Sequence, residues 1–143
     1  LSTIGGCSII GRLVLGSAFD RIGPQKSLGV CFSLLFMGLM LILLAKDPRL
    51  LFVFAPIYGI SHGGFFAIAS PTVAHFFGTR SHGMLFGTVL FFGALGGTLG
   101  PVITGRVYDL FQSYDNAFMM LIGLTVIGLL LTLALKNPNP TTA

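Results

Sequence analysis

Residues 28–45 read LGVCFSLLFMGLMLILLA, a run in which no residue is charged. A helix needs about 20 mostly apolar residues to cross roughly 30 Å of hydrocarbon, and this run is close to that length. Four other runs in the chain are also predominantly apolar. Together, the five runs cover residues 1–19, 28–45, 51–77, 83–105 and 118–135, and residues 136–143 form a tail. The sequence therefore predicts an all-α fold, a bundle of five membrane-spanning helices.

The composition of the whole chain supports the same class. Of its 143 residues, 54% are hydrophobic and only 8% are charged, whereas soluble domains carry roughly 25% charged residues. A transmembrane barrel would show alternating apolar and polar positions in segments of about 10 residues, and these runs show none. The eight Lys and Arg residues are scattered singly, so there is no basic stripe for nucleic acid. We expect a multi-pass integral protein whose main partner is the lipid bilayer.

The links between the runs suggest how the helices are arranged. Three links are short and polar, at residues 20–27, 46–49 and 78–82, and a longer one covers residues 106–116. Short links favour antiparallel packing of consecutive helices. Placing the first link in the cytoplasm puts four cationic residues on that side and three on the other, which weakly favours this orientation. The membrane we expect is a plasma membrane or a bacterial inner membrane.

Glycine pairs mark the faces where helices are expected to touch. The third run contains Gly59 and Gly63, and the fourth contains two overlapping pairs, Gly93 with Gly97 and Gly96 with Gly100, followed by Pro101. Small residues four positions apart flatten one side of a helix and let another backbone approach closely. These faces are either static packing surfaces or surfaces on which helices slide during a conformational cycle.

Arg12 is the one charged residue inside an apolar run. It lies eight positions before Asp20, which places it about 12 Å into the span at 1.5 Å per residue. Charged residues at such depth usually face the bundle interior or a water-filled path, and a guanidinium binds carboxylates or phosphates well. The alternatives are that Arg12 snorkels to the interface or pairs with an acid on another helix. No acid lies within the five runs, so we interpret Arg12 as a substrate-binding residue for an anion.

His62 is the second candidate for substrate binding, and Tyr58 lies one helical turn before it. A histidine at this depth is able to carry a proton for coupled transport or to donate a hydrogen bond to a substrate. The alternative is a structural hydrogen bond to a neighbouring helix or to Tyr58 or Ser61.

Enzyme signatures are absent from the sequence. The chain has no Glu, its three His residues lack the spacing of a metal site, and neither Cys7 nor Cys31 has an adjacent base. We therefore expect no catalytic residue, no metal and no cofactor.

One motif points to a family. Residues 11–26 read GRLVLGSAFDRIGPQK and resemble the second copy of the signature loop of the major facilitator superfamily, which follows helix eight of twelve. Gly16, Asp20, Arg21, Gly23 and Lys26 carry the match. Residues 78–87 and 96–114 resemble helix eleven and the link into helix twelve of that superfamily. The resemblance implies that the chain is the C-terminal part of a transporter, comprising helices eight to twelve.

The resemblance also implies a conformational latch made of the five matching residues. Gly16 would allow close approach of helices, and Asp20 would sit near the N-terminal end of a helix in the missing N-terminal half. Arg21 and Lys26 would hold the loop at the anionic inner leaflet.

Within the superfamily, Arg12 and the glycine four residues later resemble the monocarboxylate transporters and the related oxalate/formate antiporters, in which the arginine contacts the substrate carboxylate. Two departures bear on the substrate. Ser8 occupies the position of an Asp often used for proton coupling, and no charge lies between Gly83 and Gly105, where the oxalate carriers have a Lys. The resemblance thus implies a secondary transporter, symporter or antiporter, of a small organic anion with one carboxylate. The alternative is a structural or sensory membrane protein with the same fold.

Overall fold

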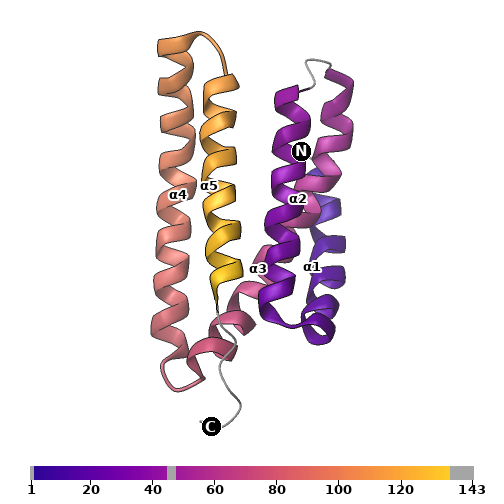
Figure 1. Cartoon of the computed structure of the whole chain (residues 1–143), viewed down its shortest axis with the longest axis vertical. Coiled ribbons are helices and arrows are strands. Elements are labelled where there is room, and N and C mark those ends of the chain that lie inside the picture. Colours follow the sequence, from indigo (N-terminus) through magenta and orange to yellow (C-terminus); the bar gives the residue numbers. More distant parts are fainter. Residues whose placement is uncertain (1, 45–47, 136–143) are drawn as a thin grey trace.

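In the computed structural model, which describes residues 2–44 and 48–135, the chain forms five α-helices (Figure 1). They are α1 (Ser2–Ile22), α2 (Pro24–Leu44), α3 (Leu51–Phe77), α4 (His82–Phe111) and α5 (Asp115–Ala134), and a short 3₁₀-helix, η1 (Pro48–Leu50), precedes α3. Each α-helix is long and apolar enough to cross a membrane. A helix suits this setting because it satisfies its own backbone hydrogen bonds. The predicted all-α bundle of five spanning helices is confirmed; Lys46, Asp47 and the tail lie outside the described residues.

The first link is much shorter than predicted. Helix α1 continues to Ile22 and α2 begins at Pro24, so Gly23 alone separates them. Gly23 has a φ of 83°, in the left-handed region that glycine adopts without steric cost, and its amide donates to the Phe19 carbonyl oxygen at 3.0 Å. Pro24 is suited to the first position of a helix because its φ is already helical. Together these two residues reverse the chain within one position.

The predicted link at residues 106–116 is also mostly helical, because α4 runs to Phe111. The residues after Gly105 are polar enough to suggest a loop, but they include no Gly or Pro that would end the helix. The helix ends where Gln112 adopts a φ of 52° and donates its amide to the Tyr108 carbonyl oxygen at 2.7 Å. Tyr108 stacks on Tyr114 at 4.4 Å between ring centroids, which holds the turn into α5 together.

The helices that pack most closely are not consecutive in the chain. Helix α1 packs mainly against α3, and α2 packs against both α3 and α5. All consecutive helices are in contact, as the short links predicted, but apart from α2 with α3 these contacts are smaller than those of α1 with α3 and of α2 with α5. A core cluster of Leu15, Leu28, Cys31 and Ile68 joins the first three helices. The α1–α2 and α3–α4 turns lie at the same end of the bundle (Figure 1).

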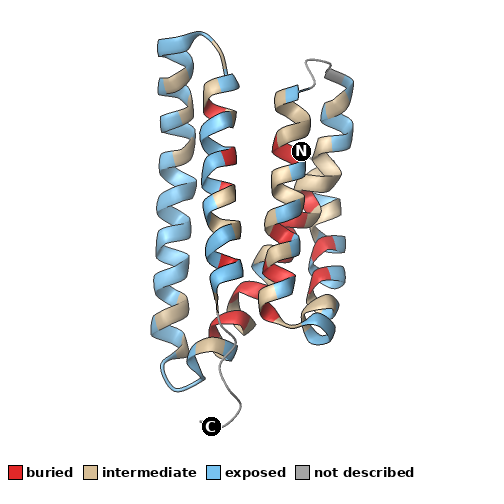
Figure 2. Ribbon diagram, in the orientation of Figure 1, coloured by how far each residue is buried: buried red, intermediate tan, exposed pale blue. Residues whose placement is uncertain are grey.

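Helix α4 is the least covered part of the described chain. It has no buried residue, and its ribbon is almost entirely in the exposed colour in Figure 2. It touches α3 and α5 only sparingly. One side-chain hydrogen bond joins its start to α3, between Ser70 Oγ and His82 Nε2 at 3.1 Å. Helix α4 therefore presents most of its apolar length to whatever surrounds this part of the protein.

Candidate functional site

Glycines let α1 and α3 cross with their backbones in contact near the middle of both helices. A Cβ atom at Gly59 would lie 2.8 Å from the Ile4 carbonyl oxygen. Added Cβ atoms at Gly63 and Gly11 would collide with the Ser8 and Ile60 carbonyl oxygens, respectively. Close approach of this kind is how membrane helices gain packing energy, since lipid supplies no hydrophobic drive to bring them together. The crossing therefore sets the position of every side chain around it.

Arg12 lies immediately beside this crossing. It is the eleventh of the 21 residues of α1, which places it about 15 Å from either end of the helix. Its side chain is exposed, and among the described residues it forms no ion pair or hydrogen bond with an acidic group. A charge at that depth is expensive to place in lipid. Within the part of the chain that the structure describes, Arg12 is thus a midspan cation with no neutralising acid.

An aromatic column follows one side of α3 at intervals of four residues. Phe54 stacks on Tyr58 with ring centroids 5.4 Å apart, and Tyr58 stacks on His62 at 5.5 Å with an interplanar angle of 12°. Phe66 meets the other side of His62 edge-on at 5.0 Å. Residues four apart are neighbours on a helix surface, so these contacts follow directly from the spacing. The column holds the exposed His62 ring between two aromatic rings.

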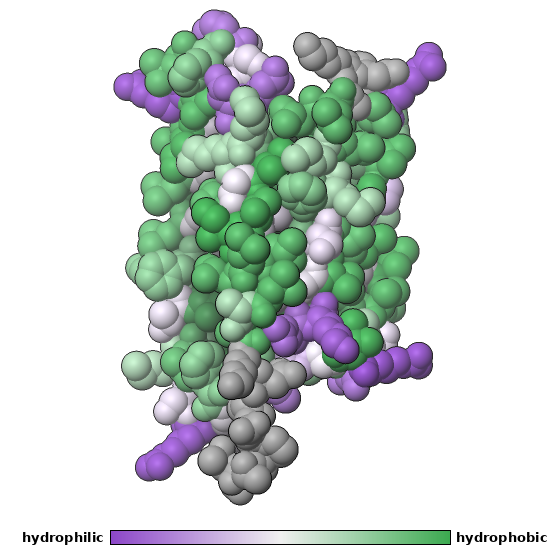
Figure 3. Space-filling model, viewed as in Figure 1, coloured by the Kyte–Doolittle hydropathy of each residue, from purple (hydrophilic) through white to green (hydrophobic). Residues whose placement is uncertain are grey.

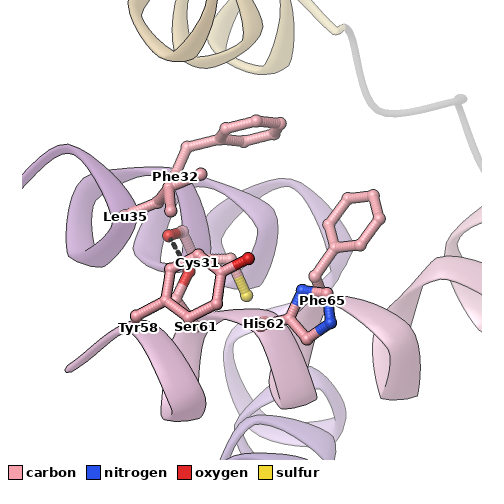
Figure 4. A pocket seen from close by; sticks show the side chains of 7 residues that line it. All are labelled: Cys31, Phe32, Leu35, Tyr58, Ser61, His62 and Phe65. Carbon is pink, nitrogen blue, oxygen red and sulfur yellow. Dashed lines mark hydrogen bonds between the residues drawn. The ribbon is translucent and has the colours of Figure 1, made fainter. Parts of the chain in front are cut away.

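The same side of α3 forms a cavity with α2, which we call the α2–α3 cavity (Figure 4). Its volume is about 180 Å³. The lining side chains are Cys31, Phe32 and Leu35 from α2 and Tyr58, Ser61, His62 and Phe65 from α3. Ser61 Oγ donates a hydrogen bond to the Cys31 carbonyl oxygen at 2.8 Å and joins the two helices at the base of the cavity. The Tyr58 hydroxyl and the His62 ring are its main polar groups.

The structure brings Tyr58 and His62 together but leaves Arg12 apart from both. The residues of α3 that meet α1 include Gly59, Ile60 and Gly63. Since each residue turns a helix by about 100°, Tyr58 and His62 lie about a third of a turn away from that side. Among the described residues, no hydrogen bond or ring contact joins Arg12 to either.

Besides Phe65, the sequence did not indicate the three cavity residues of α2, which are Cys31, Phe32 and Leu35. They lie on a different helix from the Tyr58–His62 pair, and the pairing of α2 with α3 is not visible in an apolar pattern. Ser61 was one open alternative as a hydrogen-bond partner of His62, and in the described structure its hydroxyl donates to the Cys31 carbonyl oxygen. Tyr58 does contact His62, but through ring stacking.

The five latch residues lie on both sides of the α1–α2 turn, with Lys26 in the first turn of α2. Asp20, Arg21 and Lys26 are exposed, and Gly16 has open space where a Cβ would be. Gly23 makes the turn itself, and its carbonyl oxygen accepts a hydrogen bond from the Ser27 amide at 3.1 Å. The charged side chains of the segment are therefore free to meet groups outside this chain.

The two sets of glycine pairs behave differently. Gly59 and Gly63 are buried against α1. The glycines of α4 have no neighbouring atom within 4 Å of an added Cβ among the described residues, and Pro101 beside them is exposed. These four glycines are Gly93, Gly96, Gly97 and Gly100. Equal spacing in the sequence thus corresponds to a packed face on α3 and an open face on α4.

Replacing Ser61 with alanine is expected to lower the free energy of unfolding of the full-length protein by about 0.6–1.5 kcal/mol, because it removes a buried interhelical hydrogen bond. Ser17→Ala is the matched control, since the Ser17 hydroxyl is exposed and bonds only to the Val14 carbonyl oxygen of its own helix. Thermal unfolding in detergent measures both changes. Equal losses in the two variants would contradict a stabilising role for the Ser61 bond.

The helices, their apolar surfaces and a charged residue at midspan together define a multi-pass integral membrane protein. A family model, described as Major Facilitator Superfamily, matches residues 1–143. The chain belongs to the major facilitator superfamily, as the motif at residues 11–26 indicated.

Individual relatives are similar to the chain at moderate identity. Monocarboxylate transporter 9 of Gallus gallus is 35% identical over 123 residues, which is 82% of this chain and 24% of the relative. Monocarboxylate transporter 10 is 32% identical in Rattus norvegicus, over 82% of this chain and 23% of the relative. The Homo sapiens protein of the same name is 32% identical over 84% of this chain and 24% of its own length. The chain thus spans about a quarter of the length of these relatives.

No solved structure gives a significant match to the chain. The resemblance to the monocarboxylate branch of the superfamily is confirmed by the curated relatives. Membership in a family of transporters also agrees with the expectation of a transport protein rather than an enzyme.

Proposed function

We propose that this chain is the C-terminal part of a secondary transporter that moves a small organic anion with one carboxylate. Arg12 carries the proposal, because it is an exposed midspan cation without an acidic partner among the described residues. A guanidinium offers two parallel N–H donors to a carboxylate. The names of the relatives, which are monocarboxylate transporters, support the same substrate class.

The proposed mechanism is alternating access, in which two halves of the full-length protein rock around a site near the bilayer midplane. The open glycine face of α4 supports a partner outside this chain, since a helix with no buried residue has its packing surface still available. We assign that partner to the N-terminal helices of the same protein. Gly59 and Gly63 provide the fixed contact with α1, and the glycines of α4 with Pro101 provide the contact with the other helices.

The latch segment has a role in the same cycle. Asp20 and Arg21 are exposed at the end of α1 and are available to a facing helix end. A contact there would favour the state closed at this side of the membrane, because it exists in that state alone. Lys26 belongs to the same segment.

Tyr58 and His62 form the second part of the proposed site, on the wall that faces the α2–α3 cavity. His62 is exposed and held between two rings. It is the candidate for proton coupling because an imidazole nitrogen is able to accept and release a proton. Among the described residues, His62 and Arg12 share no hydrogen bond, so a proton at His62 and an anion at Arg12 would be held by different groups.

The experiment is uptake of radiolabelled lactate and oxalate by the full-length protein in proteoliposomes, with protein-free liposomes as the control. We expect lactate uptake well above the control and less uptake of oxalate, because Arg12 is the one cationic residue near the middle of a described spanning helix. Unlabelled lactate added outside should compete with the label. An absence of uptake for every organic anion tested would contradict the proposal and favour the non-transporting alternative.

A further inference from the structure

A groove runs between α2 and α5 on the outside of the bundle, and we call it the α2–α5 groove. Its volume is about 600 Å³. The lining residues are Gln25, Lys26, Gly29, Val30, Ser33, Leu34 and Met37 from α2 with Leu129 and Leu133 from α5. The groove is apolar along most of its length, and Lys26 is the one charged residue in its lining. Figure 3 shows the hydrophobic surface of this face of the molecule, with hydrophilic side chains gathered toward both ends.

Two contacts keep the walls of the groove together. The Phe32 ring packs against Gly128, where an added Cβ would lie 2.7 Å from the ring. At the end of the helices, Gln25 Nε2 donates a hydrogen bond to the Leu133 carbonyl oxygen at 3.0 Å. Beside these contacts the small residues Gly29 and Ser33 line space that no described side chain fills. The groove is therefore built by the packing of α2 on α5.

The length and charge of the groove match one leaflet of a bilayer. From Lys26 to Met37 the helix rises about 16 Å at 1.5 Å per residue, and half of the hydrocarbon thickness is about 15 Å. Lys26 lies beside the α1–α2 turn, at the end of the bundle where headgroups are found, and Met37 lies near the middle of α2. The groove thus combines a cation at the depth of the lipid headgroups with an apolar channel as long as one leaflet. This combination is complementary to an anionic lipid.

We propose that the α2–α5 groove binds an anionic phospholipid, with one acyl chain along Val30, Leu34 and Met37 and the headgroup phosphate at Lys26. The ammonium group neutralises the phosphate, and the apolar walls select a ligand that carries a long hydrocarbon chain. Free phosphate lacks the chain, and a zwitterionic lipid has no net charge for Lys26 to neutralise. This site does not depend on the proposed transport function, and its test measures binding alone.

The test is native mass spectrometry of the full-length protein with phosphatidylglycerol and with phosphatidylcholine of the same acyl chains. We expect phosphatidylglycerol to bind more tightly than phosphatidylcholine, and Lys26→Gln to weaken phosphatidylglycerol binding about fivefold, since one Lys near a membrane surface contributes about 1 kcal/mol. Lys26→Arg should retain most of the affinity. Arg80→Gln is the matched control, because Arg80 lies at the same end of the bundle but outside the groove.

A second variant tests the acyl chain. Gly29 has open space where a side chain would be, so Gly29→Leu should fold normally and fill part of the groove. We expect it to weaken binding of phosphatidylglycerol, and we expect inorganic phosphate at millimolar concentration not to displace the lipid. The proposal would be overturned if the two lipids bound equally well, or if Lys26→Gln and Arg80→Gln weakened binding by the same amount. It would also be overturned if phosphate displaced the lipid, or if Gly29→Leu left binding unchanged.

Discussion

Replacing Gly63 with leucine will prevent the full-length protein from forming its native bundle, whereas leucine at Gly123 will be tolerated. A side chain at Gly63 would collide with the carbonyl oxygen of Ser8 at the α1–α3 crossing. Overpacking a core costs about 1–3 kcal/mol when side chains are able to adjust. Here the colliding atom belongs to a backbone, so we expect the cost to reach at least the upper end of that range.

Gly123 is a matched control because it also lies within a spanning helix but has no atom within 4 Å of an added Cβ. The two variants gain the same apolar side chain, which removes helix propensity and hydropathy as explanations for a difference. Size-exclusion profiles and thermal unfolding in detergent measure the outcome. Similar yields and similar unfolding temperatures for the two variants would show that the α1–α3 crossing does not require glycine at position 63.

Replacing Arg12 with alanine in the full-length protein is expected to lower the rate of monocarboxylate uptake by about 10- to 100-fold. Hydrogen bonds to charged groups contribute about 1.5–3 kcal/mol, which corresponds to a change of that size. Arg12→Lys keeps the charge but loses the planar pair of donors, so it should lie between alanine and the wild type. Initial rates in proteoliposomes at a fixed lactate concentration give the comparison.

Arg106→Ala is the control for loss of a positive charge, because Arg106 is exposed near the end of α4 rather than at midspan. It should leave the rate of uptake close to that of the wild type. Thermal unfolding of the Arg12 variants separates binding from folding. Unchanged uptake in Arg12→Ala would remove Arg12 from the substrate site, and a loss of uptake matched by a loss of folded protein would assign it a structural role.

The candidate site was only partly predictable from the sequence. Arg12 is identifiable from its position in an apolar run, since a charge at that depth is rare whatever surrounds it. Tyr58 and His62 are neighbours for a similarly local reason, because they are four residues apart on one helix. The rest of the α2–α3 cavity depends on the packing of α2 against α3, which brings in Cys31, Phe32 and Leu35. Nothing in the sequence of α2 indicates that α3 is its packing partner.

The glycine pairs illustrate the same limit. Gly59 with Gly63 and Gly93 with Gly97 have identical spacing, yet the first pair meets the α1 backbone and the second meets no atom of the described chain. Spacing establishes that a face is flat, but a flat face is equally suited to any helix that presents a complementary surface. Which partner it meets depends on the arrangement of the whole bundle.

The sequence by itself determined that the chain enters a membrane, that it does so with five helices, and that one cation lies at midspan. These properties can be predicted from the sequence because the hydropathy and length of a helix depend only on residues that are close together in the chain. Only the tertiary structure decided that α1 packs on α3, that α2 and α5 form a groove ending at Lys26, and that the glycines of α4 are open. In lipid, the pairing of helices depends on close surface fit rather than on hydrophobicity, and an apolar sequence does not distinguish one fit from another.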